Sequence, residues 1–387
     1  MAALLCRLGA PGGAGWRLGA GRSSLSGRGS GRGSGQGRSQ RALTGHAQAA
    51  GPPEVDTQRL EGSDDGIVEV LMCRHRARNA LGHVFVSQMR EVVSSLSGDS
   101  AVRVVVFRSA VPGVFCAGAD LKERALMSNA ESDLFVHGLR SLMTQIAALP
   151  MPTIAALDGA ALGGGLELAL ACDLRTAGVA AWLRAGERAY SAQMGLIETT
   201  RGLLPGAGGS QRLPRMVGIT LAKELIFTGR RVGGQAALEM GLVNRAVEQN
   251  QTGDAAHREA LSLAREILPQ VSAHTLTPSF CPAARAGVCG IVLQEGSRPL
   301  PLSPEQLICS SSLLLPLSLH PPCLYLQASA PIAVRMAKEA MNRGTEVDIG
   351  SAMAIERMCY ARVIPTRDRQ EGMAAFMEKR PPQYTGE

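Results

Sequence analysis

The chain has 387 residues, of which 45% are hydrophobic and 19% charged, enough for one large folded domain or two small ones. It carries 40 Lys and Arg residues against 33 Asp and Glu, and seven of the arginines lie in residues 1–50, which contain no acidic residue. The rest of the chain is therefore balanced and gives no support for a nucleic-acid-binding surface. The nine cysteines include no CxxC pair, which argues against a zinc site or disulfide framework and favours reduced thiols.

Residues 1–50 are rich in Gly, Ser, Ala and Arg and contain no lysine. This composition predicts a targeting segment that directs the protein to the mitochondrial matrix, with a plain disordered tail as the alternative. The apolar start at 1–5 is too short for a secretory or membrane segment, and the apolar run at 313–319 is short and broken by a proline. We therefore expect no membrane span.

Strand-like and helix-like segments then alternate along the chain. The continuous apolar, mostly β-branched run at 104–107 predicts a strand buried on both faces, and 67–71 and 153–157 are also predicted as strands. Helical spacing of apolar residues predicts helices at 83–96 and 132–148. This alternation predicts an α/β fold with parallel strand pairing. From about residue 218 the pattern is mostly helical, with helices expected at 221–227, 234–240, 255–267, 330–341, 351–363 and 366–376.

Two stretches interrupt this order. Residues 176–194 separate a strand expected to end near Arg175 from the segment that contains Glu198, and they are too many for a plain connection. Residues 271–329 hold eight of the 21 prolines and four of the nine cysteines, and their apolar residues show no stable period. This second stretch predicts an unstructured insertion.

The most informative stretch is 157–173, with the sequence LDGAALGGGLELALACD. Its three consecutive glycines allow a close approach to the backbone, and the apolar run after them predicts a buried helix. The free N–H groups at the start of such a helix suit an oxygen that carries negative charge. Glu167 follows Gly164 by three residues and so lies on the same helical face. The stretch is a candidate acid–base site, and the alternative is a packing contact with Glu167 in solvent.

Two further clusters contain residues suited to catalysis. In 114–123, VFCAGADLKE, a free N–H near Ala119 is a second candidate oxyanion donor, although the segment alone also fits a tight turn capped by Asp120. In 195–213, Glu198 has apolar neighbours, which raise the pKa of a carboxyl group and keep its proton available near neutral pH. The glycines of this third cluster are not followed by Gly-Lys-Ser/Thr, so it is no phosphate loop and otherwise fits a loop that leads into a helix.

Together the three clusters resemble the enoyl-CoA hydratase/isomerase, or crotonase, superfamily, because they stand in that family's order. The resemblance covers about residues 64–270 and 330–387 and implies the crotonase fold, a spiral of ββα units with a helical C-terminal trimerisation region. The domains expected are the targeting segment, a spiral core with the acyl-CoA site at 51–250, and a helical region at 251–387 interrupted by the insertion. The implied partners are an acyl-CoA thioester and further copies of the chain in a homotrimer or hexamer, without nucleic acid or membrane. No metal or cofactor is implied beyond the coenzyme A of the substrate.

The resemblance also implies a role for each matching residue. The backbone N–H groups of Ala119 and Gly164 match those that bind the thioester oxygen. Glu167 matches the carboxylate that activates water for attack at the β-carbon, Glu198 the carboxyl that protonates the α-carbon, and Gly206 a backbone position that helps to hold the water. The residues that match the coenzyme A site are Arg76, Ala77, Ala117, Gly118, Asp120, Leu121 and Lys122. A variable segment, 125–135, is expected to shape the acyl pocket.

The presence of both glutamates favours a hydratase of fatty-acid or branched-chain amino-acid catabolism over family members that retain one. An isomerase or another reaction in the same pocket, a weakly active acyl-CoA-binding homologue and a non-catalytic partner subunit remain as alternatives. RNA binding, which one family member performs through a lysine-rich helix, is disfavoured because the matching helix at 83–96 contains Arg90 and no lysine. The length and branching of the acyl chain cannot be predicted.

The chain departs from the family pattern at both interruptions. Extra residues within 176–194 can displace the strand that positions Glu198. A displacement of about 1 Å can lower the catalytic rate roughly a hundredfold. Deleting 271–329 restores a continuous family-like sequence, which suggests an alternatively spliced or mispredicted segment. In the folded protein this segment would obstruct the C-terminal helices through which members of the family form trimers.

Overall fold

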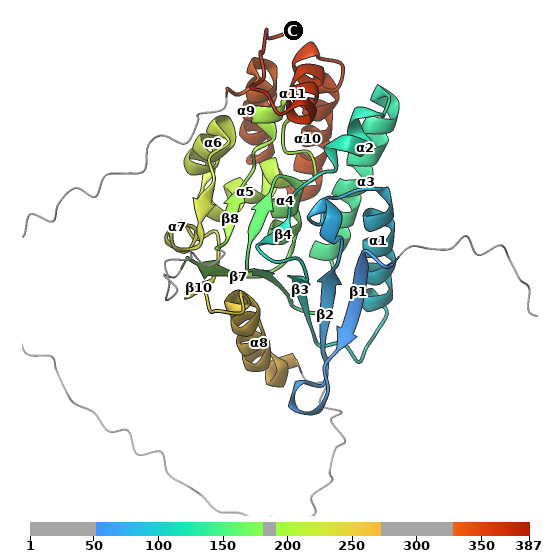
Figure 1. Cartoon of the computed structure of the whole chain (residues 1–387), viewed down its shortest axis with the longest axis vertical. Helices are drawn as coiled ribbons and strands as arrows, with labels where there is room; N and C mark the ends of the chain where they lie inside the picture. Colours follow the sequence, from blue (N-terminus) through green and yellow to red (C-terminus); the bar gives the residue numbers. More distant parts are fainter. Residues whose placement is uncertain (1–51, 181–190, 272–327) are drawn as a thin grey trace, which may run out of the picture. The chain divides into compact units, whose positions relative to one another are not determined.

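The computed structural model describes residues 52–180, 191–271 and 328–387 (Figure 1). The predicted targeting segment and nearly all of the predicted insertion at 271–329 lie outside the described residues. The described segments belong to a single contact unit, Gly51–Glu387.

A six-stranded sheet with the order β1-β2-β3-β5-β7-β10 forms the base of the fold. Its strands are β1 (Val55–Arg59), β2 (Ile67–Met72), β3 (Val104–Ser109), β5 (Thr153–Leu157), β7 (Leu174–Val179) and β10 (Arg245–Glu248). β1 pairs with β2 in antiparallel fashion, and every other neighbouring pair is parallel. The three strands predicted from apolar runs are β2, β3 and β5. All five side chains of β5 are buried, which explains why its sequence shows no polar alternation.

A second, smaller sheet has the order β4-β6-β8-β9. Its strands are β4 (Val114–Cys116), β6 (Ala160–Leu162), β8 (Gln193–Gly195) and β9 (Val232–Gly233). Three times, the chain passes from a strand of the large sheet to one of the small sheet and then to a helix. The strand pair β3–β4 is followed by the short helix α2 (Leu121–Ala125) and then α3 (Asn129–Ala147), β5–β6 by α4 (Gly164–Ala171), and β7–β8 by α5 (Gly209–Val217). This repeat is the ββα spiral that the resemblance implies.

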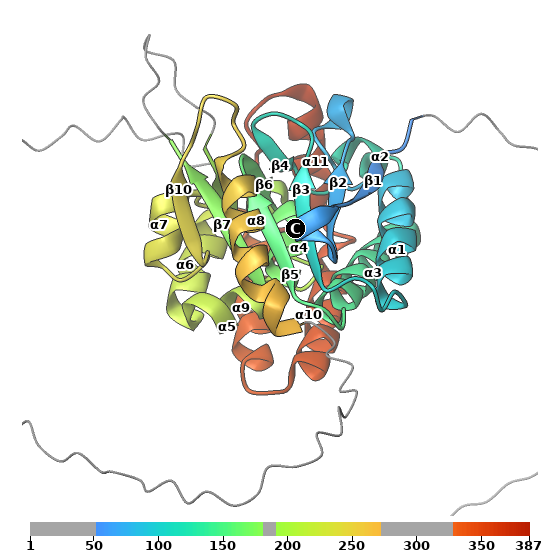
Figure 2. The same cartoon turned by 90° about the horizontal axis from the view of Figure 1, so that it is seen from below.

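Helices cover both faces of the large sheet. On one face α8 (Ala255–Ile267) packs its Ala260 and Ala264 against Ile67, Val104 and Ile154, and Figure 2 shows it lying across the strands. The other face packs against the main core, which includes α1 (His83–Ser97), α3 and α4.

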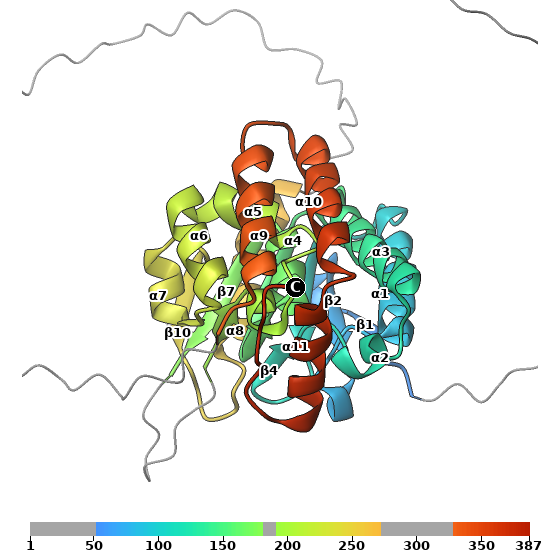
Figure 3. The same cartoon turned by 90° about the horizontal axis from the view of Figure 1, so that it is seen from above.

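The C-terminal region is helical, as predicted. Helices α9 (Pro331–Gly344) and α10 (Ile349–Val363) pack against each other and against α5, and α9 also contacts α6 (Ile219–Thr228). Helix α11 (Arg367–Glu378) packs against α2 (Leu121–Ala125) and against the 3₁₀ turn η3 (Glu198–Arg201), and Figure 3 shows this group of helices from above. The chain's end thereby reaches the segment that contains Glu198.

Several predicted boundaries were wrong. The helix predicted at 132–148 begins at Asn129, because Ser128 and Glu131 form a capping box. The strand expected to end near Arg175 continues to Val179, and β8 begins at Gln193, so the ends of the predicted insertion at 176–194 belong to strands. The short strands β9 and β10 interrupt a region predicted as helical, whereas the helix predicted at 234–240 is present as α7 (Gly234–Glu239). Within the described residues, no helix has the length and apolar content needed to span a membrane.

Candidate active site

The site is built around the N-terminus of α4. Strand β6 pairs with β4 and β8 and ends at Leu162; the N–H of the next residue, Gly163, donates to the carbonyl of Gly195 at 2.8 Å. Gly163 has φ +52°, a conformation that favours glycine. At Gly165 a Cβ atom would lie 2.2 Å from the carbonyl oxygen of Cys116, so only glycine allows α4 to approach β4 this closely. The glycine run was predicted to allow a close approach to the backbone. In the structure the segment that approaches it is the second cluster, at Cys116.

Two free backbone N–H groups lie next to each other at this contact. The residues on either side of Ala119 are hydrogen-bonded to Leu81: the Leu81 N–H donates to the Gly118 carbonyl, and the Asp120 N–H donates to the Leu81 carbonyl. Its own N–H, like that of Gly164 at the start of α4, has no acceptor among the residues that the structure describes. A Cβ on Gly164 would lie 3.6 Å from the Ala119 nitrogen, which shows how close the two donors are. The pair can receive one shared oxygen atom.

Glu167, one turn into α4, is 3% exposed, and its side chain is held in one orientation. Its Oε1 accepts hydrogen bonds from the backbone N–H groups of Ala207 and Gly209, both at 2.8 Å. Burial and the charge of Glu356 raise the pKa of Glu167 to about 7, against the lowering effect of those two bonds. This carboxylate can accept a proton near neutral pH.

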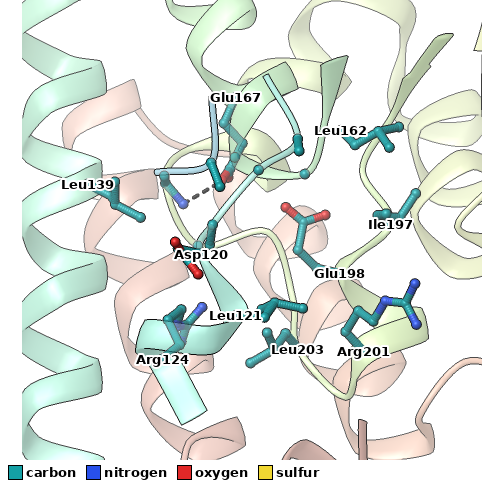
Figure 4. Close-up of a pocket in the computed structure, with 18 of the residues that line it drawn as sticks. Asp120, Leu121, Arg124, Leu139, Leu162, Glu167, Ile197, Glu198, Arg201 and Leu203 are labelled. Atoms are coloured by element: carbon teal, nitrogen blue, oxygen red, sulfur yellow. Dashed lines mark hydrogen bonds between the residues drawn. The ribbon is translucent and has the colours of Figure 1, made fainter. Parts of the chain in front are cut away.

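Glu198 is the first residue of η3, and its carboxyl group is buried. Neither of its carboxyl oxygens has a hydrogen-bond partner within the described part of the chain. Burial, followed by the charge of Glu167, raises the pKa of Glu198 well above its ordinary value. The apolar neighbours read from the sequence predicted this direction. A Cβ on Gly163 would lie 3.1 Å from the Glu198 Oε1, and a Cβ on Gly164 would lie 3.8 Å from the Glu167 Oε2. The two carboxyl groups thus lie close to adjacent residues (Figure 4).

A third buried carboxylate supports the first, and sequence analysis did not find it. Glu356 of α10 is fully buried and accepts bonds from the Gly208 N–H at 2.9 Å, the Ser210 hydroxyl at 2.6 Å and Arg140 Nε at 3.1 Å. Because Gly208 lies between the two residues that bind Glu167, one loop holds both carboxylates. The only available signal was a charged residue on a helix face that is otherwise apolar.

The two N–H donors, Ala119 and Gly164, and the carboxyl groups of Glu167 and Glu198 border one cavity of about 490 Å³. Every residue predicted for the site lines it, namely Arg76, Ala77, Ala117, Gly118, Ala119, Asp120, Leu121, Lys122, Gly164, Glu167, Glu198 and Gly206. The lining also includes the apolar residues Val136, Leu139, Leu162, Ile197, Leu203, Leu204 and Phe376. The expectation that 125–135 shapes the acyl pocket was wrong, since the lining residues fall just outside that segment, at Arg124, Val136 and Leu139.

Two predicted residues have structural partners. The Asp120 side chain caps α2 through the N–H groups of Lys122 and Glu123, and it forms an ion pair with Arg74 at 2.9 Å. Its carboxylate is thereby occupied, as in the alternative that the sequence left open. The Gly206 backbone lines the cavity, where a Cβ would lie 2.5 Å from the ring of Tyr360, but the bonds to Glu167 come from the residues that follow.

The family model for enoyl-CoA hydratase/isomerase matches residues 62–285 and 323–387. The chain belongs to this family. The three motifs therefore predicted the family correctly.

Named relatives agree with this assignment. The chain is 54% identical over 338 residues to enoyl-CoA hydratase domain-containing protein 2, mitochondrial, of Homo sapiens, covering 87% of this chain and 92% of the relative. It is 43% identical over 334 residues to methylglutaconyl-CoA hydratase, mitochondrial, of Homo sapiens, covering 86% of this chain and 78% of the relative. The solved structure of an enoyl-CoA hydratase from Bacillus anthracis matches 86% of this chain and 100% of its own, with 33% identity and a TM-score of 0.51.

Proposed function

We propose that the protein is an enoyl-CoA hydratase that adds water across the 2,3 double bond of an enoyl-CoA thioester. The observation that supports this most is that two buried carboxyl groups, Glu167 and Glu198, lie next to the free backbone N–H groups of Ala119 and Gly164. A base and an acid on either side of one bond, next to a site for a developing oxyanion, meet the needs of hydration.

In the proposed reaction the thioester oxygen accepts bonds from the N–H groups of Ala119 and Gly164. Glu167 takes a proton from water as the hydroxyl oxygen bonds to the β-carbon, and the electrons of the double bond move toward the thioester to give an enolate. Glu198 then donates its proton to the α-carbon. Because the enolate oxygen carries more charge than the ground-state carbonyl, the two donors favour the transition state, each by about 3 kcal/mol.

The protonation states fit these roles. A pKa of about 7 leaves Glu167 substantially ionised at neutral pH, and burial together with the charge of Glu167 raises the pKa of Glu198 well above its ordinary value, so that Glu198 keeps its proton. After one turnover the proton has moved from Glu198 to Glu167, so a transfer between them or through solvent restores the enzyme. The proposed chemistry moves only protons and water and uses no cofactor beyond the coenzyme A of the substrate.

Cationic side chains border the cavity where we place coenzyme A. Arg76, Arg78, Lys122 and Arg231 are exposed lining residues. Lys122 supplies a point charge suited to a phosphate group. The backbone around Ala117 and Gly118 brings this part of the lining to the two N–H donors.

The proposal is tested by hydration of crotonyl-CoA, followed by the loss of enoyl-thioester absorbance, with the full chain. We expect Glu167→Gln and Glu198→Gln each to lower kcat by at least about a hundredfold with little change in KM. Glu339→Gln, a surface substitution on α9, is the matched control and keeps activity. Equal rates in wild type and in both site variants would refute the mechanism.

The same assay separates the alternatives. Conversion of a 3-enoyl-CoA without hydration would identify an isomerase, and binding of CoA esters without turnover would identify a non-catalytic homologue. RNA binding remains disfavoured, since α1 contains Arg90 and no lysine. A tight RNA affinity that falls steeply with salt would overturn that view.

We also propose assembly and location from the family resemblance. The α9–α10 pair exposes Val347, Ile349 and Met358, apolar side chains that a trimer or hexamer would cover. Light scattering of the purified full chain tests this, and a monomer at micromolar concentration would contradict it. For location we propose the mitochondrial matrix, because both human relatives are named mitochondrial. Fractionation of mitochondria from cells that express the full chain is the test.

A further inference from the structure

The cavity contains a cation that the proposed mechanism does not use. Arg124, on α2, lines the cavity beside Leu121 and is only 3% exposed, and Figure 4 shows it among the other lining residues. Burying a guanidinium costs free energy unless an anion compensates it. No carboxylate lies within ion-pair distance of Arg124 among the residues that the structure describes.

The hydrogen bonds of Arg124 are also incomplete. Its Nη2 donates to the hydroxyl of Tyr360 at 2.6 Å, and the guanidinium carbon lies 5.9 Å from the centre of that ring. Its Nε is buried without an acceptor, and no acceptor for Nη1 occurs in the described part of the chain. The Tyr360 bond holds the guanidinium in place while leaving donors of its planar fork free for a ligand.

The surroundings add to the positive charge. Burial, followed by the charge of Arg124, lowers the pKa of Arg369 of α11, which is 2% exposed. Among the described residues its guanidinium bonds to neutral groups: Asn129, Ser132 and the Ile364 carbonyl. Glu198 lies within electrostatic reach, but burial and Glu167 favour its protonated, neutral form. The surroundings of Arg124 therefore contain an excess of buried positive charge.

We infer that Arg124 binds a carboxylate at the far end of the substrate's acyl chain, so that the preferred substrate is the CoA monothioester of a short unsaturated dicarboxylic acid. This inference rests on the proposed hydratase function and specifies its substrate class. A planar guanidinium matches a carboxylate through two parallel hydrogen bonds, which an uncharged acyl chain cannot replace. An acyl chain that ends in a methyl group would leave the buried cation uncompensated.

The test compares two pairs of substrates that differ only at the end of the chain. Glutaconyl-CoA is compared with trans-2-pentenoyl-CoA, and 2-hexenedioyl-CoA with trans-2-hexenoyl-CoA, so that chain length is controlled. In the wild-type full chain we expect kcat/KM to be at least about tenfold higher for the carboxylated member of one pair, the usual scale of a hydrogen-bonded charge pair. An equal or lower value for the carboxylated member of both pairs would overturn the inference.

The variants separate recognition from folding. Arg124→Met should lose roughly a hundredfold on the carboxylated substrate, mostly in KM, and stay within about threefold of wild type on the uncharged one. Arg124→Lys, which keeps the charge, should recover part of the loss. Arg357→Met, a surface substitution on α10, is the matched control. Equal losses on both substrates would identify a purely structural role.

Two further outcomes are informative. If Arg124→Met weakens the binding of coenzyme A itself, measured by calorimetry, the guanidinium binds a phosphate and the inference fails. If no enoyl-CoA of either kind is hydrated, the proposed function fails first. Hydration of uncharged substrates alone leaves the proposed function intact and refutes only the carboxylate specificity.

Discussion

Glu356 offers a direct test of how the fold sets the acidity of the proposed base. Its charge is one of the two largest causes that raise the pKa of Glu167 to about 7. In Glu356→Gln the amide oxygen can still accept from the Gly208 N–H, and the amide nitrogen can donate to the Ser210 hydroxyl oxygen, but the side chain carries no charge. The positive charge of Arg140, which favours the ionised form of Glu167, then acts without its partner.

The expected shift follows from these charges. A charged neighbour at short range changes a carboxyl pKa by roughly 1–3 units. Because the base must be ionised to act, the rate rises with pH through the pKa of Glu167. Lowering that pKa therefore moves the acid limb of the kcat/KM profile to lower pH, by about 1–2 pH units in the variant.

The assay is crotonyl-CoA hydration from about pH 5 to pH 9, normalised to each protein's own plateau. Removing one partner of a buried ion pair typically costs about 3–5 kcal/mol, so thermal unfolding must show that Glu356→Gln is folded at the assay temperature. Glu339→Gln, on the surface of α9, controls for loss of a carboxylate elsewhere. An acid limb that stays in place, or moves to higher pH, in a folded variant would refute the reasoning.

Two further predictions concern stability and backbone conformation. The pKa of Glu167 rises from 4.5 in the unfolded chain to about 7 in the folded protein, so folding stability is lost as the pH rises through this window. The free energy of unfolding of Glu167→Gln should therefore exceed that of wild type by up to about 3 kcal/mol above pH 7 and by nothing below pH 4.5. Urea unfolding that shows the same gain at both pH values would contradict this. Gly118→Ala forces a side chain onto a residue at φ +95°, with a Cβ 2.6 Å from the Leu162 carbonyl, and should lose about 1–3 kcal/mol and roughly tenfold or more in kcat. Gly62→Ala, at φ +68° in open space, is the matched control and should keep full activity; if both variants lose activity equally, the close contact at Gly118 is not the cause.

The sequence predicted the parts of the site that are local. The run Gly163–Gly165 followed by Glu167 predicts a glycine-lined helix start with a carboxylate one turn later, because helical geometry alone fixes that relation. Apolar runs likewise predicted β2, β3 and β5, and periodic spacing predicted most C-terminal helices to within a few residues. The short strands β9 and β10 were missed because two to four residues carry too little pattern.

The contacts that set the chemistry could not be predicted from the sequence. Glu356 meets the Gly208 N–H across 148 positions, and Arg124 meets Tyr360 across 236. No periodicity or spacing reports such pairings, and a charged residue on a helix resembles a solvated one until the packing is known.

The difference between the features predicted from the sequence and those that required the structure has a physical cause. Backbone conformation and helix initiation depend on neighbours within a few residues, so the sequence by itself determined the elements, the glycine positions and the family's motifs. A carboxyl pKa depends on burial and on nearby charges, whatever their place in the chain. The sequence indicated this only coarsely, through the apolar neighbours of Glu198. Tertiary packing decided that Glu167 and Glu198 face the same cavity with raised pKa values, and that Arg124 is buried there with no carboxylate partner among the residues that the structure describes.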